Sequence, residues 1–262
     1  MKKKVFREER LRMIMEMLFE QKSVSVDQLS EQFDKSPGMI RLDLAELESR
    51  GLISRTHGGA ILVKDSAEDF VLEKNLLQLR VETKKEEKIR IGKAVANLIH
   101  DGDSVMMDGG STNYFAAIEL RKKRNLKIVT TSLFLFPVLS EIPDAIIYLT
   151  GGVLRREYQD TFGEIALDTI KRFQPEHTIL GVDGVSRTSG FTTVDPGLAM
   201  IKRQMVAVSK NLIVAADSSK FGKVCLLSIT DIERASVIIT DTGLPVEEAD
   251  ALRQLGPEVI RA

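Results

Sequence analysis

The 262-residue sequence predicts two fold classes in one chain, a small all-α/winged helix domain followed by an α/β domain with a mostly parallel, Rossmann-like sheet. Up to Gly51, apolar residues recur at helical spacing, and a short glycine-containing hairpin pattern follows. From Thr83 onward, short apolar runs alternate with helical stretches, as in βαβ units. The stretch between mixes charged and scattered apolar residues. We therefore assign residues 1–63 and 83–262 to the two domains and 64–82 to a linker.

The first predicted helix spans residues 7–21, where apolar side chains recur at the i, i+3, i+4, i+7 and i+8 positions. These side chains are Leu11, Ile14, Met15, Leu18 and Phe19. The run 23–25 interrupts the pattern. Ser25 and Gln28 then have the spacing of a capping box, which opens a second, short helix that ends at Phe33. Asp34 and Lys35 form the turn into the next helix.

A third helix is predicted to begin after Ser36, because this residue can cap the free N–H groups and Pro37 suits the first helical position. Its buried side would consist of apolar residues that recur until Gly51 ends the run. These are Ile40, Leu44 and Leu47. The opposite side would present other residues to solvent, namely Gly38, Arg41, Leu42, Ala45 and Glu48.

A β-hairpin is predicted directly after this helix. The runs 52–56 and 60–63 flank His57-Gly58-Gly59, whose glycines permit the positive φ that a hairpin turn requires. A helix followed by a hairpin is the layout of a winged helix. Three helices with a tight second turn are typical of a helix-turn-helix, whose later helix lies in the major groove of DNA.

Double-stranded operator DNA is therefore an expected partner, although the spacing alone also fits a generic three-helix cap. The net charge of −1 means that DNA affinity must come from a local patch rather than from the whole surface. The residues expected to contact DNA are Ser36, Gly38, Met39, Arg41, Arg55, His57 and Gly58.

The composition excludes several other classes of protein. An apolar fraction of 43% is ample for a hydrophobic core. Every uncharged run is shorter than the roughly 18 residues that cross a bilayer, and the basic start leads into charged residues rather than an apolar signal region. We expect a cytoplasmic protein with no membrane partner. Cys225 and the three histidines cannot assemble a zinc site, so we expect no metal and no cofactor.

The second domain is predicted to open with a helix. Thr83 and Glu86 have the spacing of a capping box. Apolar residues continue the helix to residues 101–102, namely Ile89, Ile91, Val95 and Leu98.

Six apolar runs in this domain are predicted to be strands, at residues 104–107, 127–129, 145–149, 178–182, 212–216 and 236–239. Each ends in polar or glycine residues, at 108–112, 130–132, 150–152, 183–184, 217–220 and 240–241. The carboxyl ends of parallel strands share one edge of the sheet, where open α/β folds bind ligands. A single polar strand end often serves only to turn the chain, so it is the convergence of all six that indicates a pocket.

The most specific strand end is Asp108-Gly109-Gly110-Ser111-Thr112, a glycine turn before a helix predicted from Asn113 to Leu120. Glycine N–H groups, a helix N-terminus and two hydroxyls form an oxyanion cradle, so we predict that a phosphate binds there. The turn lacks the Gly-x-x-x-x-Gly-Lys pattern of a nucleoside triphosphate site. Lys220 would neutralise the ligand, unless it is a solvated turn residue.

Arg155 and Arg156 are weaker candidates for this neutralising role, because they follow the glycine pair after the third predicted strand. The complete set of residues expected at the ligand site is Asp108, Gly109, Gly110, Ser111, Thr112, Thr131, Ser132, Gly151, Gly152, Asp183 and Lys220.

Several motifs in residues 5–63 resemble the N-terminal domain of the DeoR family of bacterial transcription regulators. They are Ile40-Arg41, Asp43-Leu44, Leu47-Glu48, Gly51 and the run 55–60. The chain departs from that family at Met39 and Leu42, where threonine and arginine are common. A contact by arginine at the position of Leu42 is therefore not expected, and Arg41, Arg55 and the hairpin around His57 would carry more of the DNA contacts.

Residues 83–241 resemble the C-terminal effector domain of the same family, through the motifs at 101–103, 108–112, 149–152, 181–184, 190–193 and 217–220. That domain is similar in fold to ribose-5-phosphate isomerase, and the family generally senses phosphorylated sugars or related metabolites. The resemblance implies a transcriptional regulator, expected to repress a carbohydrate operon under control of a phosphorylated sugar. Relatives often have Glu-Ala where this chain has Leu198-Ala199, so that carboxylate is missing.

The resemblance to an isomerase raises the alternative of a sugar-phosphate isomerase-like enzyme fused to a DNA-binding domain. Such isomerases commonly carry two acids after the fourth strand and then a lysine in a glycine-rich loop. Here Asp183 is present, but residues 184–190 contain neither the second acid nor the lysine. We therefore expect a sensor that is not an enzyme, although Asp108 or Asp241 could supply an acid from another strand. Since helix-turn-helix proteins usually bind paired half-sites, we also expect a homodimer or homotetramer assembled through the C-terminal domain.

Overall fold

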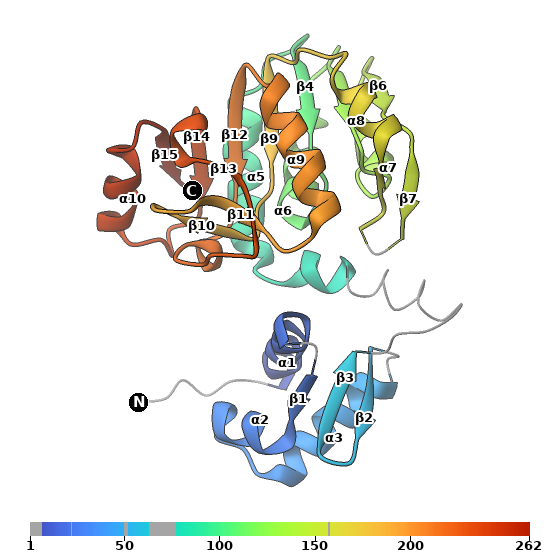
Figure 1. Ribbon diagram of the computed structural model, residues 1–262, viewed down its shortest axis with the longest axis vertical. Helices are drawn as coiled ribbons and strands as arrows, with labels where there is room; N and C mark the ends of the chain where they lie inside the picture. The colour runs from blue at the N-terminus through green and yellow to red at the C-terminus, as the bar shows by residue number, and fades with distance from the viewer. Residues whose placement is uncertain (1–6, 22, 50–51, 63–76, 157) are drawn as a thin grey trace. The chain divides into compact units, whose positions relative to one another are not determined.

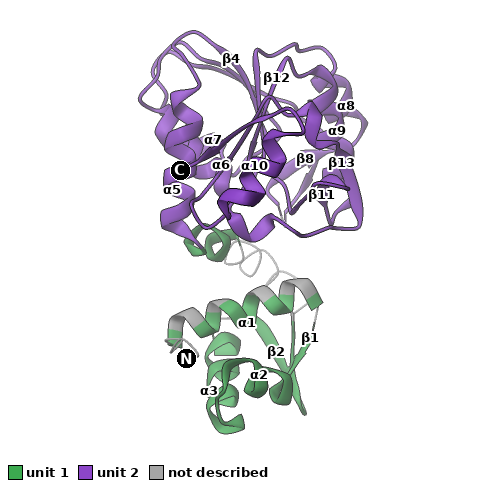
Figure 2. Cartoon of the chain, turned by 90° about the vertical axis from the view of Figure 1, so that its left-hand side faces the viewer, with its two compact units in different colours: residues 1–83 green, residues 84–262 purple. Residues whose placement is uncertain are grey.

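The computed structural model describes residues 7–21, 23–49, 52–62, 77–156 and 158–262 (Figure 1). The chain forms two compact units, residues 1–83 and 84–262 (Figure 2). Of the predicted linker, residues 64–76 lie outside the described residues, and residues 77–82 are helical. Gly51, expected to end the third helix, also lies outside them. No helix in the described part of the chain is long and apolar enough to cross a membrane.

The N-terminal unit is a winged helix, as predicted. Its elements are α1 (Arg7–Gln21), β1 (Ser23–Ser25), α2 (Val26–Phe33), α3 (Pro37–Ser49), β2 (Ile53–Thr56) and β3 (Gly59–Leu62). The strands form an antiparallel sheet in the order β1-β3-β2. Residues 23–25, predicted only as a break between helices, thus supply a third strand to the wing.

Side-chain caps begin the second and third helices. Ser25 Oγ accepts a hydrogen bond from the Gln28 amide (3.1 Å), and Gln28 Oε1 accepts one from the Ser25 amide (3.5 Å), which confirms the capping box. Ser36 Oγ accepts a hydrogen bond from the Met39 amide (3.3 Å), and Pro37 is the first residue of α3. Between the two helices Asp34 turns the chain with a φ of 53°.

The core of this unit draws on all three helices and all three strands. Burial of each large aliphatic side chain contributes about 1.5–3 kcal/mol relative to leaving it exposed. The buried apolar residues are Leu11, Ile14, Met15, Leu18, Val24, Val26, Leu29, Phe33, Ile40, Leu44, Leu47, Leu52, Ile53 and Ala60. The side chain of Phe19, predicted to belong to this set, lies outside the described residues.

The predicted reason for the glycines in the hairpin is wrong. Neither Gly58 nor Gly59 adopts a positive φ. Thr56 pairs with Gly59, so only His57 and Gly58 form the turn. A Cβ atom on Gly59 would lie 1.9 Å from the carbonyl oxygen of Val24, because β1 pairs with β3 at this point. Gly59 therefore permits the close approach of a third strand, a requirement that the hairpin sequence alone does not reveal.

The C-terminal unit is built on a seven-stranded parallel sheet with the strand order β15-β14-β12-β9-β4-β5-β6. Its strands are β4 (Ser104–Met107), β5 (Lys127–Thr130), β6 (Ile146–Leu149), β9 (His177–Leu180), β12 (Asn211–Ala215), β14 (Val237–Thr240) and β15 (Glu258–Arg261). The first six correspond to the six predicted strands. The edge strand β15 was not predicted.

Helices cover both faces of this sheet (Figure 1). α5 (Lys85–Asn97), α6 (Ser111–Leu120) and α7 (Phe136–Leu139) pack on one face, and α8 (Glu164–Ile170), α9 (Pro196–Val208) and α10 (Val246–Arg253) on the other. The alternation of side chains along each strand produces the two layers of core. In β4, for example, Val105 and Met107 contact the first group of helices and Met106 the second.

Two small antiparallel sheets accompany the main sheet. One consists of β7 (Val153–Arg155) and β8 (Asp160–Phe162), and the other of β10 (Gly184–Ser186), β11 (Gly190–Thr193) and β13 (Leu227–Thr230). Short 3-10 helices span Ser218–Lys220 and Ile232–Arg234. The first small sheet lies beyond the carboxyl end of β5, where Ser132 bridges to Asp160.

The start of the C-terminal unit differs from the prediction. The Thr83 hydroxyl does not cap α5 but donates to the carbonyl of Leu79 (2.8 Å), in the preceding helical segment. Lys84 occupies the N-cap position with a φ of 50° and no side-chain cap. The helix then packs so closely on α6 that a Cβ atom on Gly92 would lie 2.6 Å from the carbonyl carbon of Phe115.

Candidate functional site

The exposed face of α3 carries several of the residues predicted to contact DNA. Ile40 is buried, whereas Met39 is 43% exposed and Leu42 66% exposed. Gly38 and Arg41 are exposed on the same face. An arginine can reach a phosphate or a base edge, but a leucine can donate no hydrogen bond. Arg41 is therefore an exposed cation on this face, and its neighbour Leu42 is an exposed apolar residue.

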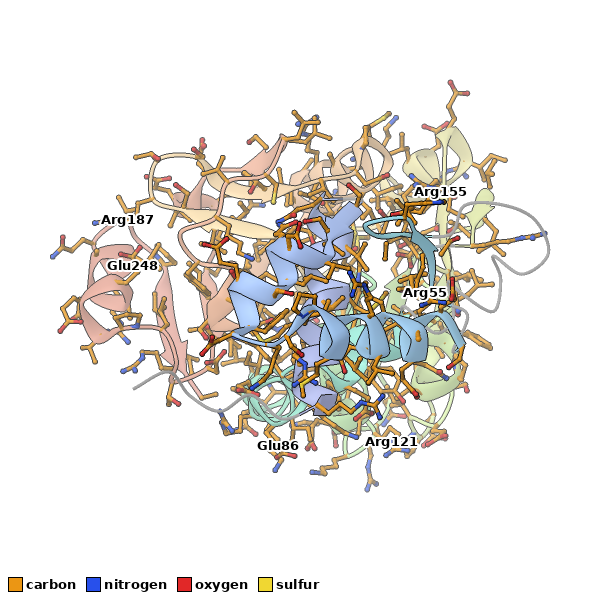
Figure 3. All side chains as sticks on the ribbon, turned by 90° about the horizontal axis from the view of Figure 1, so that it is seen from below. Arg55, Glu86, Arg121, Arg155, Arg187 and Glu248 are labelled. Carbon is orange, nitrogen blue, oxygen red and sulfur yellow. The ribbon has the colours of Figure 1, made fainter. Side chains whose placement is uncertain are left out.

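A groove between α3 and the wing collects the other predicted DNA-contact residues. It is lined by Val26, Arg41, Leu44, Glu48, Arg55, Thr56, His57, Gly58 and Gly59. Within it lies Arg55, which is labelled in Figure 3. Arg55 Nε donates to Glu48 Oε2 (2.6 Å), and the Arg55 amide donates to Glu48 Oε1 (2.9 Å). The hydrogen bond from the Arg55 backbone, followed by that from its guanidinium, lowers the pKa of the Glu48 carboxyl. Arg55 is therefore oriented by α3.

A buried ion pair fixes the position of α3. Arg10 of α1 donates from Nε to Asp43 Oδ2 (2.5 Å) and from Nη2 to Asp43 Oδ1 (3.1 Å), with side-chain exposures of 5% and 1%. Arg7 approaches the same carboxylate from solvent, at 3.5 Å. The sequence does not predict this ion pair, because Arg10 and Asp43 lie 33 residues apart and α1 shows only a helical apolar pattern.

In the C-terminal unit, the predicted strand ends do converge on one edge of the sheet. The carboxyl ends of β4 and β9 are neighbours, since the amide of Gly181 donates to Asp108 Oδ2 (3.2 Å). Asn113 Nδ2 donates to the carbonyl of Asp108 (2.8 Å) and so closes the turn between β4 and α6. β8 joins this group, because the Thr161 amide donates to the carbonyl of Thr131 (2.9 Å).

The predicted oxyanion cradle adopts the geometry of a helix N-terminus without a cap. α6 begins at Ser111, earlier than predicted, and its N-cap residue Gly110 has a φ of 110° and provides no side-chain cap. A Cβ atom on Gly110 would meet no atom within 4 Å, so space is open on that side. Ser111 and Thr112 are half-buried in the first turn. The first-turn N–H groups of α6 and these two hydroxyls are of the kind that bind an anion.

Asp108 does not face the ligand space as a free carboxylate. It is 1% exposed, and Lys202 of α9 donates to its Oδ2 and to the carbonyl of Gly181 (2.8 Å). Asp160 of β8 lies beside the same pair and is 4% exposed. A Cβ atom on Gly109 would lie 2.6 Å from Asp160 Oδ2. Lys202 therefore pairs with Asp108, and a second buried carboxylate, Asp160, lies beside this pair next to the cradle.

Burial dominates the protonation of these two acids. It raises the pKa of Asp108, although the charge and hydrogen bond of Lys202 oppose the shift. Burial, together with the charge of Asp108, raises the pKa of Asp160 to about 7. Asp160 Oδ1 has no hydrogen-bond partner among the described residues. The cluster can therefore hold a proton near neutral pH.

The other predicted ligand residues occupy varied environments on this edge. Thr131 and Ser132 are 2% and 0% exposed, inside the junction of β5 with β8. Gly151 and Gly152 have φ values of 74° and 111°, and they turn the chain from β6 into β7. Asp183 accepts a hydrogen bond from Thr193 Oγ1 (2.6 Å).

Lys220 lies after β12, which is separated from the cradle strand β4 by β9. Burial raises the pKa of nearby Asp217, but the Ser219 hydroxyl and the charges of Lys220, Lys88 and Lys84 outweigh it and hold the pKa below the ordinary value. Lys84 Nζ lies 3.4 Å from Asp217 Oδ1. This end of the edge is therefore rich in lysine.

The two arginines after the glycine pair differ from each other. Arg155 donates from Nη1 to Asp195 Oδ1 (2.8 Å) and from Nη2 to Asp195 Oδ2 (2.9 Å), and it lies over the ring of Phe162. Burial raises the pKa of Asp195, but the hydrogen bonds from Arg155 and from the Leu198 amide outweigh it and lower the pKa. Arg156 is exposed.

Three buried polar residues of the site were missed by the sequence analysis, namely Lys202, Asp160 and Lys88. Lys202 lies inside a helix that reads as amphipathic, 94 residues from Asp108, and Asp160 follows a weak strand pattern. The only sequence sign of such residues is a charged side chain at a position where the helical or strand pattern predicts an apolar one. Among the described residues there is no group of histidine, cysteine or acidic side chains that could hold a metal ion.

Comparison with known proteins identifies both units. The model of the DeoR-like helix-turn-helix domain matches residues 10–66, and that of the DeoR C terminal sensor domain matches residues 83–242. The Glycerol-3-phosphate regulon repressor of Escherichia coli (strain K12) is 34% identical over 239 residues, 91% of this chain and 92% of its own length. The HTH-type transcriptional repressor GlcR of Bacillus subtilis (strain 168) is 31% identical over 258 residues, 98% and 96% of the two chains.

Among solved structures, ribose 5 phosphate isomerase A from Neisseria gonorrhoeae has a TM-score of 0.37 at 18% identity, covering 51% of this chain and 52% of that chain. This score is too low to extend any activity to the present chain.

Proposed function

Because this chain belongs to the DeoR family of transcriptional regulators, we propose that it represses a carbohydrate-metabolism operon under the control of a phosphorylated sugar, which binds at the carboxyl edge of the parallel sheet. The N-terminal winged helix would read the operator as part of a homo-oligomer. A bound effector alters such a complex only if it has different affinities for the DNA-bound and free arrangements.

The observation that carries the effector proposal is the uncapped N-terminus of α6 at Gly110. Its first-turn N–H groups and the hydroxyls of Ser111 and Thr112 suit a phosphate better than a neutral ligand, because the helix dipole favours an anion there. The name of one relative, the Glycerol-3-phosphate regulon repressor, points to the same ligand chemistry.

The buried acids next to the cradle are compatible with an anionic ligand. Lys202 offsets the charge of Asp108, and Asp160 is half-protonated near neutral pH because its pKa is raised to about 7. A phosphate at the cradle would therefore face little net negative charge. The sugar part would extend along the edge, towards Asp183 and the lysine-rich end at Lys220.

The DNA half of the proposal rests on Arg41 and on the groove between α3 and the wing. Arg41 is exposed at the first turns of the reading helix, and Arg55, His57 and Gly58 line the adjacent groove. In helix-turn-helix proteins the residues at the start of this helix reach base edges, while residues around it contact phosphates.

The test is an electrophoretic mobility shift with the full chain and DNA upstream of its own gene, repeated with a panel of sugar phosphates and the matching unphosphorylated sugars. We expect retardation of the DNA and a change in the complex with one phosphorylated sugar only. An unaltered complex across the panel would remove the support for a phosphorylated effector, and a lack of retardation would remove the support for the operator.

The alternative function is turnover of the sugar phosphate, and the same panel tests it. The relatives reported above are named as transcriptional repressors. Asp183, the acid nearest to an isomerase pattern, is already engaged by the Thr193 hydroxyl and the Val194 amide. Each sugar phosphate that shifts the melting temperature of the full chain should be recovered unchanged after incubation. Formation of the isomeric sugar phosphate would favour the enzyme.

A further inference from the structure

The two edges of the seven-stranded sheet are protected to different degrees. At one edge, β15 carries Glu258 and Arg261, and the Arg261 guanidinium donates to the carbonyl of Thr242 (2.8 Å). At the other edge, β6 consists of Ile146-Ile147-Tyr148-Leu149 and carries neither a charge nor a proline. Soluble proteins usually block an open edge with charges, proline or a bulge. By this criterion β15 is protected and β6 is not.

The unprotected edge continues into a second edge strand. β6 pairs only with β5 and β7 only with β8 among the described strands, so the outer backbone groups of both lack a strand partner there. The side chains around them are exposed and apolar. We call these residues the β6–β7 flank: Ile146, Tyr148, Leu149, Val153, Leu154 and Ile165, with exposures of 52%, 42%, 41%, 69%, 48% and 66%.

Ile146, Tyr148 and Ile165 lie on the α8 side of this sheet edge, whereas Leu149, the neighbour of Tyr148 along β6, points to the other side of the same edge strand. Gly151 and Gly152 join the two strands directly. A Cβ atom on Gly151 would lie 3.9 Å from the side chain of Ile165, which places the start of α8 against this turn. The Tyr148 ring contacts that of Phe173, beyond the end of α8, with centroids 5.1 Å apart. β6, β7 and α8 accordingly lie together at one side of the unit (Figure 1).

We propose that the β6–β7 flank is the surface on which a second copy of this chain docks, with β6 adding to its counterpart across a two-fold axis. Apolar surface of this extent on one side of a soluble protein marks an interaction site. The proposal deepens the proposed function, from which it takes the need for two reading heads on paired half-sites. It names the face through which the heads are joined.

A second copy suits this flank because the surface is complementary to itself. In a two-fold pair of antiparallel strands each residue of β6 faces a residue of the same strand, and like charges opposite each other are destabilising. The sequence of β6 contains no charge, so pairing with itself brings no like charges into opposition.

The experiment measures the mass of the full chain by size-exclusion chromatography with light scattering over a range of concentrations. Two variants place a charge on the flank, Val153→Glu and Tyr148→Lys. The matched control is Leu226→Glu, at an apolar residue that is 83% exposed and lies outside the flank. Circular dichroism melts establish that each variant is folded, and two flank positions are used so that one poorly folded variant does not decide the result.

We expect the wild-type chain and Leu226→Glu to share one oligomeric mass, and the flank variants to shift to the mass of one chain or to need at least tenfold higher concentration to associate. A monomeric wild type would overturn the proposal, as would folded flank variants that keep the wild-type mass. The measurement uses neither DNA nor effector, so its failure is distinct from failure of the proposed function, which the mobility shift reports.

Discussion

Each unit of this regulator contains a buried ion pair, and the two pairs are built differently. In the reading head, the Arg10 guanidinium meets the Asp43 carboxylate with two hydrogen bonds, and the exposed Arg7 adds a second positive charge 3.5 Å from it. At the sensor edge, the Lys202 ammonium serves Asp108 and lies beside a second buried acid, Asp160. The first pair holds two helices in place. The second leaves a carboxyl group whose protonation depends on its surroundings.

We interpret the Arg10–Asp43 pair as structural and the Lys202–Asp108 pair, with Asp160 beside it, as part of the proposed ligand site. A fully satisfied bidentate pair has a single arrangement, which suits a helix that must present Arg41 at a constant position. Asp160, with an unpartnered oxygen and a raised pKa, can instead gain or lose a proton when the charge of a neighbouring ligand changes. The predictions below test whether the two pairs behave in these different ways.

Removal of the cation should have the largest effect in both units. Lys202→Met leaves Asp108 buried without its partner and should lower the free energy of unfolding of its unit by about 3–5 kcal/mol. Arg10→Met leaves Asp43 with only the exposed Arg7, 3.5 Å away, and should cost somewhat less. Chemical denaturation followed by circular dichroism measures this. The double variants Asp108→Asn/Lys202→Met and Asp43→Asn/Arg10→Met should cost less than the single ones. A cost below about 1 kcal/mol for Lys202→Met would show that Asp108 is already neutral.

Arg41→Ala should weaken operator binding by about 10–100-fold, because a base or phosphate contact by arginine is worth about 1–3 kcal/mol. The sensor lies in the other unit, so the thermal shift produced by a bound sugar phosphate should stay the same. Arg121→Ala, which removes an exposed arginine of the C-terminal unit, is the control and should keep full DNA affinity. Loss of both DNA binding and effector response in Arg41→Ala would mean that the reading helix has been misassigned.

Asp160→Asn should flatten the pH dependence of stability. The folded-state pKa of Asp160 is raised to about 7, above its unfolded value near 3.9, so the folded state binds the extra proton between these pH values. The stability of the wild type should therefore fall as pH rises from about 4 to 7, by at most about 1.4 kcal/mol per pH unit from this residue, and level off above 7. Melting curves of both proteins at several pH values reveal the difference. Identical slopes would contradict the assignment.

Glu48→Gln should have the smallest effect, since the Glu48–Arg55 pair is solvent-exposed. The substitution removes the negative charge that pairs with Arg55, so the Arg55 guanidinium becomes available to contact DNA. We expect operator affinity to rise by roughly 2–5-fold and the salt dependence to steepen by about one phosphate contact. Binding titrations at several salt concentrations measure both quantities. Weaker binding would mean that Glu48 holds Arg55 in its DNA-contacting position.

Elements with a strong local signal were predictable from the sequence. The first helix has the predicted bounds, and the capping residues Ser25 and Ser36 act as expected, because a helix start depends on residues within one turn. Thr83 and Glu86 have the same capping-box spacing, but the prediction that Thr83 caps α5 is wrong. There the hydroxyl bonds back to Leu79, and only the position of the preceding helical segment reveals this.

The candidate site was predictable as an edge but not as a set of contacts. Open α/β folds bind ligands at the carboxyl ends of their parallel strands. The polar residues that follow each predicted strand therefore indicated the region of Gly110. The pairing of Lys202 with Asp108 joins residues 94 positions apart, and the approach of Asp160 depends on a hairpin that folds back over β5. Such contacts follow from the tertiary arrangement rather than from periodicity.

Gly92 has a consequence for how a signal leaves the sensor. Gly92 has no side chain, so at this point α5 lies directly against the backbone of α6. No side chain lies between the two helices there that could change its conformation when one helix moves. A displacement of α6 at this contact would require α5 to move with it. The first residue before α5 with a non-helical backbone is Lys84, at the start of the C-terminal unit. A displacement of α6 would therefore reach the first residues of the C-terminal unit through α5.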